Sequence, residues 1–337
     1  MAVHEVLGAF GLAPLTVERV EDGCINQTWR VVTAGGEYAL RRHRVSSPAA
    51  IAAEQLVMRT AQAGGLPVPR IVPEQEGAPF WQSGDGQIWS LASWLPGSVR
   101  LPADLTPDVA FHLGRTVAVL HAALTRLGPA QFPMAPQHSA MEPIQALEKF
   151  ATFRRLIGLK ARHDEFDEFC RAYFDQIEPR LRAGSPVLEY YRMAPAQVVH
   201  GDIWFRNVLY QGSEISGILD WEYACVAPRV WELGYVFGCW LLAPDDYAAT
   251  VERTCAFLEG YASGMCLAPG EAALVPEMYR WFRMNHTGPF YNHYILGDSR
   301  TNQFLPGNLR QIRLIEEAGP DLRAQIERRV AGLRKPR

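Results

Sequence analysis

Three oxygen-bearing side chains lie in two short polar segments of the chain. Asp202 and Asn207 belong to HGDIWFRN at residues 200–207, and Asp220 follows thirteen residues later in ILDWE at residues 218–222. A carboxylate can orient or deprotonate an attacking hydroxyl, and hard oxygen ligands can hold Mg²⁺ against nucleotide phosphates. Asp202 suits the first task, and Asn207 and Asp220 suit the second. The pattern is therefore typical of a phosphoryl-transfer site.

Apolar runs that resemble strands flank both segments, at residues 198–199, 208–210 and 215–219. An Asp with an Asn five residues later can face one cavity across a tight loop, and a hairpin then returns the chain so that Asp220 approaches the same metal. The alternative is that HGD is an ordinary turn and ILDWE a buried strand that ends in a capping Asp. The order of the two motifs and the apolar hairpin between them favour the first interpretation. We expect His200 to support the loop rather than to react.

The pattern HGD-x4-N followed by ILDWE resembles the aminoglycoside phosphotransferase and choline kinase superfamily, which shares the protein-kinase fold. The resemblance implies an α+β, bilobal protein-kinase-like fold. A small antiparallel-sheet N-lobe at residues 1–92 would bind the nucleotide, and a larger, mainly helical C-lobe at residues 93–337 would carry catalysis and the acceptor. It also implies that Asp202 is the catalytic base, that Asn207 and Asp220 bind Mg²⁺, and that ATP is the cofactor. The choice between ATP and GTP stays open.

Composition limits the possible partners and locations. The chain has 337 residues, 48% of them hydrophobic and 20% charged, as expected for a folded protein with two substantial cores. A net charge of -3 predicts no general attraction to nucleic acid. Residues 1–13 lack a basic region before an apolar core, and no stretch reaches about 18 uninterrupted apolar residues, so we expect a cytoplasmic protein that does not interact with a membrane. The oligomeric state is not predicted.

Three strands are expected early in the chain, at residues 15–20, 29–33 and 37–42. In a kinase-like lobe, the connection between the first two lies over the nucleotide phosphates, where small and hydroxyl residues let backbone amides approach. Gly23, Asn26 and Thr28 are therefore candidate phosphate contacts. The alternative is that Asp22 and Gly23 form an ordinary turn.

The third strand carries the candidate cation for the phosphates. Protein kinases place a Lys there, whereas this chain has Arg41, and its first lysine is Lys149. An arginine can hold phosphate oxygens through its planar fork. Arg42 stays an alternative, because neighbouring strand residues point to opposite faces. A helix expected at residues 48–63 contains Glu54, which the resemblance pairs with Arg41; the alternative is a solvated Glu54.

The strand expected at residues 87–95 leads into Pro96 and Gly97, where the hinge between the lobes is expected. The resemblance implies that backbone groups of residues 92–94, including Ser93 and Trp94, bind the purine edge. Helices are expected in the C-lobe at residues 105–124, 141–159, 163–183, 247–262, 269–286, 309–318 and 320–333. His121 is expected in the core. Glu232 is expected to brace the catalytic loop, which is the segment at residues 200–207.

The acceptor candidates are Glu222, Arg283 and His286. The segment RWFRMNH at residues 280–286 offers cations and hydrogen-bond donors, whereas cationic aminoglycosides are usually met by acids. It would suit an acceptor with a carboxylate or phosphate, and the run from residue 260 to 280 resembles type II homoserine kinases. Arg280 and Arg283 can equally be surface residues, and Glu222 can be a secondary metal ligand or a loop support.

The sequence thus predicts a small-molecule kinase that transfers the γ-phosphate of ATP to a hydroxyl acceptor, with a homoserine-like amino alcohol favoured. Two alternatives stay open: an aminoglycoside or other antibiotic phosphotransferase, and a non-catalytic nucleotide-binding module of the same fold. A protein kinase is disfavoured, because the seven residues between Asp220 and Pro228 are too few for a regulated activation segment.

Overall fold

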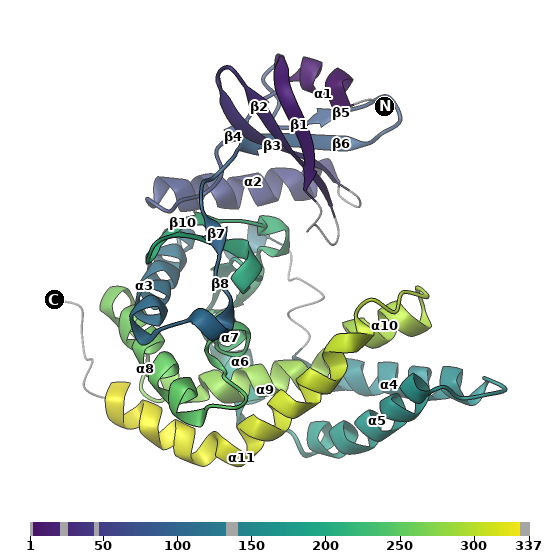
Figure 1. Ribbon diagram of the computed structural model, residues 1–337. Helices are drawn as coiled ribbons and strands as arrows, with labels where there is room; N and C mark the ends of the chain where they lie inside the picture. The colour runs from purple at the N-terminus through teal and green to yellow at the C-terminus, as the bar shows by residue number, and fades with distance from the viewer. Residues whose placement is uncertain (1–2, 21–25, 44–46, 133–140, 331–337) are drawn as a thin grey trace.

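The computed structural model describes residues 3–20, 26–43, 47–132 and 141–330. An antiparallel sheet with one long helix beneath it forms one lobe, and helices form most of the other (Figure 1). The expected α+β bilobal fold is confirmed. Each lobe has its own apolar cluster, the smaller one built from Val6, Leu7, Phe10, Val31, Leu40, Trp89 and Leu91. The lobe boundary between residues 92 and 93 stays a prediction.

The sheet of the N-lobe has the strand order β1-β2-β3-β6-β4, with β5 also paired to β6. The strands are β1 (Pro14–Val20), β2 (Gln27–Thr33), β3 (Gly36–Arg42), β4 (Ile71–Val72), β5 (Trp81–Gln82) and β6 (Ile88–Ser93). Helix α1 (Val3–Ala9), which was not predicted, contributes Val6 and Leu7 to the core of this lobe. Strand alternation buries Leu40 in that core and turns its neighbour Arg41 to the opposite face.

Helix α2 (Pro48–Ala63) has the predicted bounds and lies between the lobes (Figure 1). It begins where the Ser47 side chain accepts a hydrogen bond from the Ala50 amide, with Pro48 in the first turn, and it ends at Gly64. Its buried residues Val57, Met58 and Ala61 belong to the large apolar cluster of the C-lobe. The helix therefore anchors the sheet lobe to the helical lobe.

Eight further helices follow α2 up to α10: α3 (Pro107–Leu124), α4 (Pro143–Gly158), α5 (Glu165–Ala183), α6 (Pro186–Met193), α7 (Arg229–Val236), α8 (Tyr247–Gly264), α9 (Val275–Asn285) and α10 (Gly288–Tyr294). Helices α3 and α8 approach each other backbone to backbone. A Cβ at Gly114 would lie 1.9 Å from the Phe257 carbonyl oxygen, and one at Gly260 would lie 2.0 Å from the Phe111 carbonyl oxygen. Glycine at both positions allows this close crossing.

The C-terminal helices differ from the prediction. Two helices separated near residue 319 were expected, because proline lacks an amide donor and clashes with the preceding turn. Instead, α11 (Leu305–Val330) runs through Pro320 and curves around the lobe (Figure 1). Buried Leu322 and Ile326 hold the second half against the core. Helix α9 starts at Val275 rather than near residue 269, and α6, α7 and α10 were missed. None of the described helices is long and apolar enough to cross a bilayer.

Two small sheets hold the polar loops. Strand β9 (Val208–Gln211) pairs with β10 (Glu214–Ile218) and with β7 (Ser98–Val99), whereas β8 (Ala196–Val199) pairs with β11 (Cys225–Pro228). The chain passes from β8 to β9 through one polar loop, residues 200–207, and from β10 to β11 through a second polar loop, residues 219–224. These pairings bring the two loops together, as the predicted hairpin required.

Candidate active site

The two loops touch at Gly201. Its φ is +83°, and a Cβ built there would lie 2.1 Å from the carbonyl oxygen of Tyr223. Only glycine fits both the backbone conformation and this contact. On the other loop, Asp220 has φ 60° and ψ 70°, which makes it the single non-glycine residue with positive φ in the described part of the chain. Such conformations cost free energy and are often found at functional sites.

His200 links the two loops, because its ring contacts the backbone of both. The buried ring lies with Nε2 3.0 Å from the Leu219 carbonyl oxygen, and Nδ1 accepts the Asp202 amide at 3.2 Å. This assigns the proton to Nε2. Burial lowers the pKa of His200, although nearby Glu232 opposes the shift, so the ring is neutral. The expected supporting role of His200 matches these contacts.

Glu232 on α7 braces the catalytic loop. Its carboxylate accepts the Gly201 amide at 2.5 Å and the His200 amide at 3.4 Å, and it accepts from His121 Nε2 at 2.7 Å. Burial alone would raise the pKa of Glu232, but the bonds from His121 and Gly201 lower it below its usual range. The sequence predicted the brace and placed His121 in the core. It missed that His121 is a polar partner there, with its Nδ1 2.8 Å from the Tyr261 hydroxyl.

Asp202 is fixed by two donors. Its Oδ2 accepts from Asn207 Nδ2 at 2.8 Å, and its Oδ1 accepts from the Tyr235 hydroxyl at 2.5 Å. Burial, with help from the charge of Asp220, raises the pKa of Asp202 to about 6, while the two hydrogen bonds oppose the shift. Asp202 is therefore mainly a carboxylate at neutral pH, but a more basic one than an exposed Asp. Tyr235 was missed by sequence reasoning.

Arg41 joins the N-lobe to the loops. Its guanidinium lies 3.2 Å from Glu54, 2.6 Å from Asp220 and 3.2 Å from Glu222, so the predicted pair with Glu54 is present. Burial would lower the pKa of Arg41, but these carboxylates raise it above its usual value. Arg42 instead is exposed and donates to Gln27 at 3.4 Å. Of the two alternatives, only Arg41 lies beside Asp220.

Negative charge exceeds positive charge around Arg41. Burial raises the pKa of Glu54 to about 7 and also raises that of Glu222, with Arg41 opposing both shifts. The Glu222 carboxylate also accepts from Asn26 Nδ2 at 2.5 Å. Glu222 therefore links its loop to Asn26 and Arg41, and its expected roles as acceptor contact, metal ligand or loop support stay predictions. An additional cation would relieve the repulsion among these acids.

The side-chain oxygen atoms of Asn207 and Asp220 fit a hard divalent cation that takes its other ligands from a nucleotide. Asn207 uses its amide nitrogen for Asp202, which leaves its amide oxygen as the atom that could bind a metal. Across the described ranges, no three His, Cys, Asp or Glu residues form a metal cage. Two side chains, Asn207 and Asp220, would supply only part of an octahedral coordination sphere, as is usual for Mg²⁺ that takes its other ligands from phosphates and water.

The other nucleotide candidates have different outcomes. Gly23 lies outside the described residues. Thr28 is part of β2, opposite Arg41 in the register, rather than part of the preceding connection. The amides of Ser93 and Trp94 already donate to the carbonyls of residues 70 and 37, at 2.8 and 2.9 Å. Their amides are thus not available to a purine, and a contact with it would have to use their carbonyls.

Two of the three acceptor candidates lie near one another. Arg283 on α9 donates from Nε to the Tyr279 hydroxyl at 2.7 Å. His286 stacks on Phe282, with ring centroids 5.5 Å apart, and Phe282 in turn meets the ring of Tyr235 at 5.8 Å. The aromatic rings thus connect the acceptor candidates to the residue that holds Asp202. Glu222, the third candidate, belongs to the Arg41 cluster.

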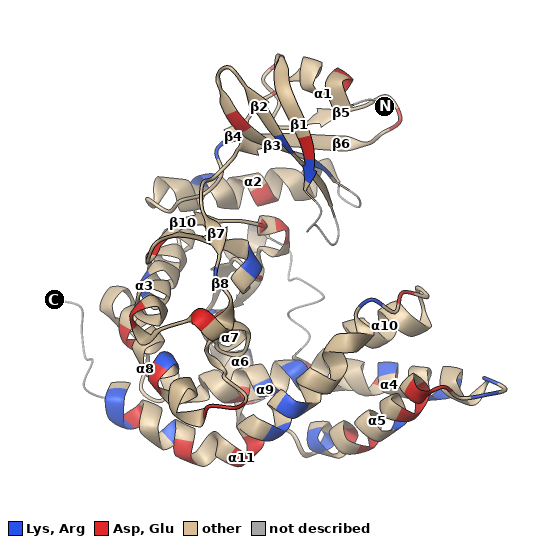
Figure 2. Ribbon diagram, viewed as in Figure 1, with Lys and Arg blue, Asp and Glu red and all other residues tan. Residues whose placement is uncertain are grey.

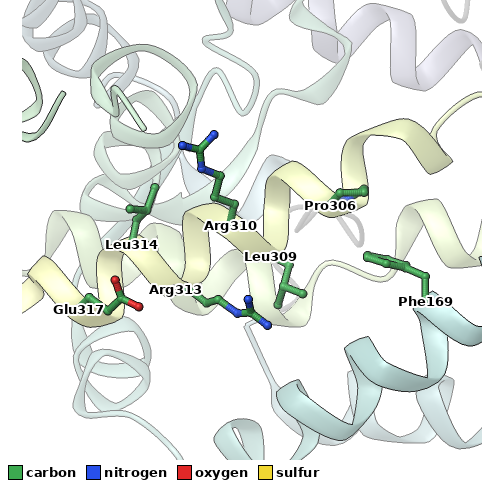
Figure 3. Close-up of a pocket in the computed structure, with 7 residues that line it drawn as sticks. All are labelled: Phe169, Pro306, Leu309, Arg310, Arg313, Leu314 and Glu317. Atoms are coloured by element: carbon green, nitrogen blue, oxygen red, sulfur yellow. The ribbon is translucent and has the colours of Figure 1, made fainter. Parts of the chain in front are cut away.

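A separate cavity of about 330 Å³ lies between α5 and α11 (Figure 3). Arg310 and Arg313 point to different sides of α11 there; Arg310 pairs with Asp245, and Arg313 donates to Gln176. Charges of both signs occur along α11 and α5 (Figure 2), and Glu316 pairs with an arginine of α5 at 2.8 Å. The cavity contains none of the predicted site residues, and its arginines have partners within the chain.

The sequence profile of a phosphotransferase enzyme family, APH, matches residues 16–275. The chain belongs to the APH family. This confirms the resemblance that the HGD and ILDWE motifs indicated. A homoserine kinase from Methylobacterium radiotolerans is 27% identical over 294 residues, which cover 83% of this chain and 81% of that protein.

Solved structures share the fold of this APH-family chain. An aminoglycoside phosphotransferase from Alicyclobacillus acidocaldarius superposes with a TM-score of 0.69 at 17% identity, covering 98% of this chain and 97% of the other. Amicoumacin kinase, in complex with AMP-PNP and Ca²⁺, superposes with a TM-score of 0.66 at 16% identity and 92% coverage of both chains. These likenesses extend over nearly the whole chain, so the bilobal fold is common to all three.

Proposed function

We propose that this APH-family protein is a kinase that transfers the γ-phosphate of ATP to a hydroxyl group of a small molecule. The observation that carries the proposal is the arrangement around Asp202. Its carboxylate is oriented by Asn207 and Tyr235, and the second loop brings Asp220 into the adjoining acidic cluster with Arg41. The nucleotide in the related amicoumacin kinase supports the choice of ATP.

Each residue has a defined task in this proposal. Asp202 orients the acceptor hydroxyl and takes its proton, because its carboxylate is fixed and its pKa of about 6 makes it a usable base. Asn207 and Asp220 hold Mg²⁺, and Arg41 steadies the phosphates. Bound Mg²⁺ neutralises charge on the phosphate oxygens. Most of the rate enhancement then comes from positioning and charge stabilisation rather than from covalent chemistry.

Further contacts to ATP belong to the same proposal. Asn26 and Thr28 lie near Arg41, through Glu222 and through the strand register respectively, which supports a role near the phosphates. Gly23 is proposed from the sequence resemblance alone. Ser93 and Trp94 are proposed to contact the purine through carbonyl groups. Glu54 acts through its ion pair with Arg41.

The favoured acceptor is a homoserine-like amino alcohol. The similarity to a homoserine kinase, which covers about four-fifths of both chains, supports this choice. An antibiotic acceptor is the second candidate, because amicoumacin kinase has the same fold over nearly the whole chain. A cytoplasmic location stays a prediction.

The test is ADP release from ATP with Mg²⁺ over a panel of homoserine, choline, sugars, aminoglycosides and nucleoside antibiotics. We expect turnover with an amino-acid alcohol. Asp202→Asn should lower kcat by about 10²- to 10⁴-fold, the usual contribution of a general base, while leaving nucleotide binding nearly unchanged. A wild-type protein that binds ATP but releases no ADP with any acceptor would favour the non-catalytic alternative. Normal turnover by Asp202→Asn would remove Asp202 from its role.

A further inference from the structure

Two arginines on α9 have opposite surroundings. Arg280 lies 2.6 and 2.7 Å from the two carboxylate oxygens of Glu277, and 3.8 Å from Glu316. Arg283, one turn later, has the Tyr279 hydroxyl as its hydrogen-bond acceptor, and it forms no ion pair with any carboxylate of the described chain. The two side chains therefore form a natural matched pair, one with its charge compensated and one without.

Arg283 keeps its charge in partly buried, aromatic surroundings. Its guanidinium lies 5.0 Å from the centroid of the Tyr279 ring and 5.8 Å from that of Phe282. An arginine side chain does not lose its proton, so desolvation must be offset by other interactions. Cation–π contacts stabilise a guanidinium less than a bidentate carboxylate does. The described hydrogen bond uses Nε, which leaves the two terminal nitrogens for such an anion.

Arg283 is linked to Asp202 through Tyr235, which its charge reaches. The Tyr235 hydroxyl donates to Asp202, and the Tyr235 ring meets Phe282, the neighbour of Arg283 on α9, edge to face. Burial raises the pKa of Tyr235, Asp202 raises it further, and Arg283 opposes the shift, so both charges act on the same hydroxyl. A small molecule between Arg283 and Asp202 would meet a cation at one end and a carboxylate base at the other.

We propose that Arg283 binds a carboxylate of the acceptor and thereby presents the acceptor hydroxyl to Asp202. This inference rests on the proposed kinase function and specifies its substrate class: hydroxy acids and amino-acid alcohols. A bidentate pair with the planar guanidinium would fix the direction of the acceptor as well as its affinity. Polycationic acceptors such as aminoglycosides would meet Arg283 as a like charge, which selects against them.

The test compares acceptors that differ only by the carboxylate. L-homoserine and 3-amino-1-propanol share the amino group and the hydroxyl chain, and L-serine and ethanolamine form a second pair. Binding is measured by isothermal titration to the full-length protein with ADP and Mg²⁺ present. We expect the wild-type protein to bind the carboxylate member of at least one pair about tenfold more tightly or better, as is usual for charge-assisted bonds.

Arg283→Gln should reduce this ratio to about one, and the matched control Arg280→Gln should leave it unchanged. Arg283→Lys, which keeps the charge without the fork, should give an intermediate ratio, and it decides the question if Arg283→Gln does not fold. No preference for the carboxylate in either pair, or an unchanged ratio in the Arg283 variants, overturns the proposal. Failure of the kinase function itself is seen separately, as absence of ADP release by the wild-type protein.

Discussion

The two sides of the catalytic loop differ in how their charges are compensated. Behind the loop, Glu232 accepts from His121 and from two loop amides, and all these groups are buried. In front of it, the one positive charge of Arg41 faces three carboxylates in partly exposed positions. The rear network fixes the backbone, whereas the front keeps negative charge that a bound cation can neutralise. Stability and ligand binding should therefore respond differently to substitutions on the two sides.

Substitution of Glu232, which braces the catalytic loop from its buried side, should have the largest effect on stability. Glu232→Ala leaves the Gly201 amide and His121 without their acceptor in a buried site, so the free energy of unfolding should fall by about 3 to 5 kcal/mol. Urea unfolding followed by circular dichroism measures this loss. In contrast, Glu222→Ala also relieves repulsion between Glu222 and Asp220, so it should cost about 1 kcal/mol or less. Equal losses in the two variants would contradict the distinction between rear and front.

Substitution of Arg41 tests ligand binding on the side of the loop that carries the three carboxylates. Arg41→Gln removes the cation proposed to hold the phosphates, so the Kd for ATP with Mg²⁺ should rise by about ten- to a hundredfold, as for a charged hydrogen bond worth about 1.5 to 3 kcal/mol. Arg42→Gln is the matched control, because this neighbour is exposed on the other face of β3 and should leave the Kd unchanged. If both variants weakened ATP binding alike, Arg41 would have no special role.

Substitution of Tyr235 should have the smallest effect, and this effect should appear in the pH dependence of activity. Its hydrogen bond lowers the pKa of Asp202, so Tyr235→Phe should raise that pKa above about 6. Because only the ionised carboxylate accepts a proton, activity falls as pH drops through this pKa. The acid limb of kcat should therefore move to higher pH by about half to one unit, with little change at pH 8. A uniform loss at every pH would indicate a structural role instead.

The parts of the site encoded by local motifs were predictable. Asp202, Asn207 and Asp220 lie on short loops between apolar runs, and the pair of Arg41 with Glu54 followed from the family resemblance. Tyr235 and His121 were not predicted as partners, because their contacts with Asp202 and Glu232 depend on how α7 and α3 pack. A single tyrosine or histidine on an apolar helix gives no sign of such a contact in the sequence.

The fold shows the same limit. Strands and long amphipathic helices were found, whereas the short helices α6, α7 and α10 were missed. Pro320 suggested a break, but packing of Leu322 and Ile326 against the core outweighed the local cost of proline within α11. Backbone groups of Ser93 and Trp94 were expected to bind the purine, but both amides donate to segments that are distant in the sequence.

The contact between Gly201 and the Tyr223 carbonyl has a further consequence. The backbone separation between the loop of the proposed base, Asp202, and the loop of the proposed metal ligand, Asp220, is limited where the two main chains meet. If α9 binds the acceptor as proposed, exchange of its residues would leave this backbone contact between the two loops unaltered. A single methyl group at position 201, by contrast, would clash with the Tyr223 carbonyl and push the loop of Asp202 away from the loop of Asp220.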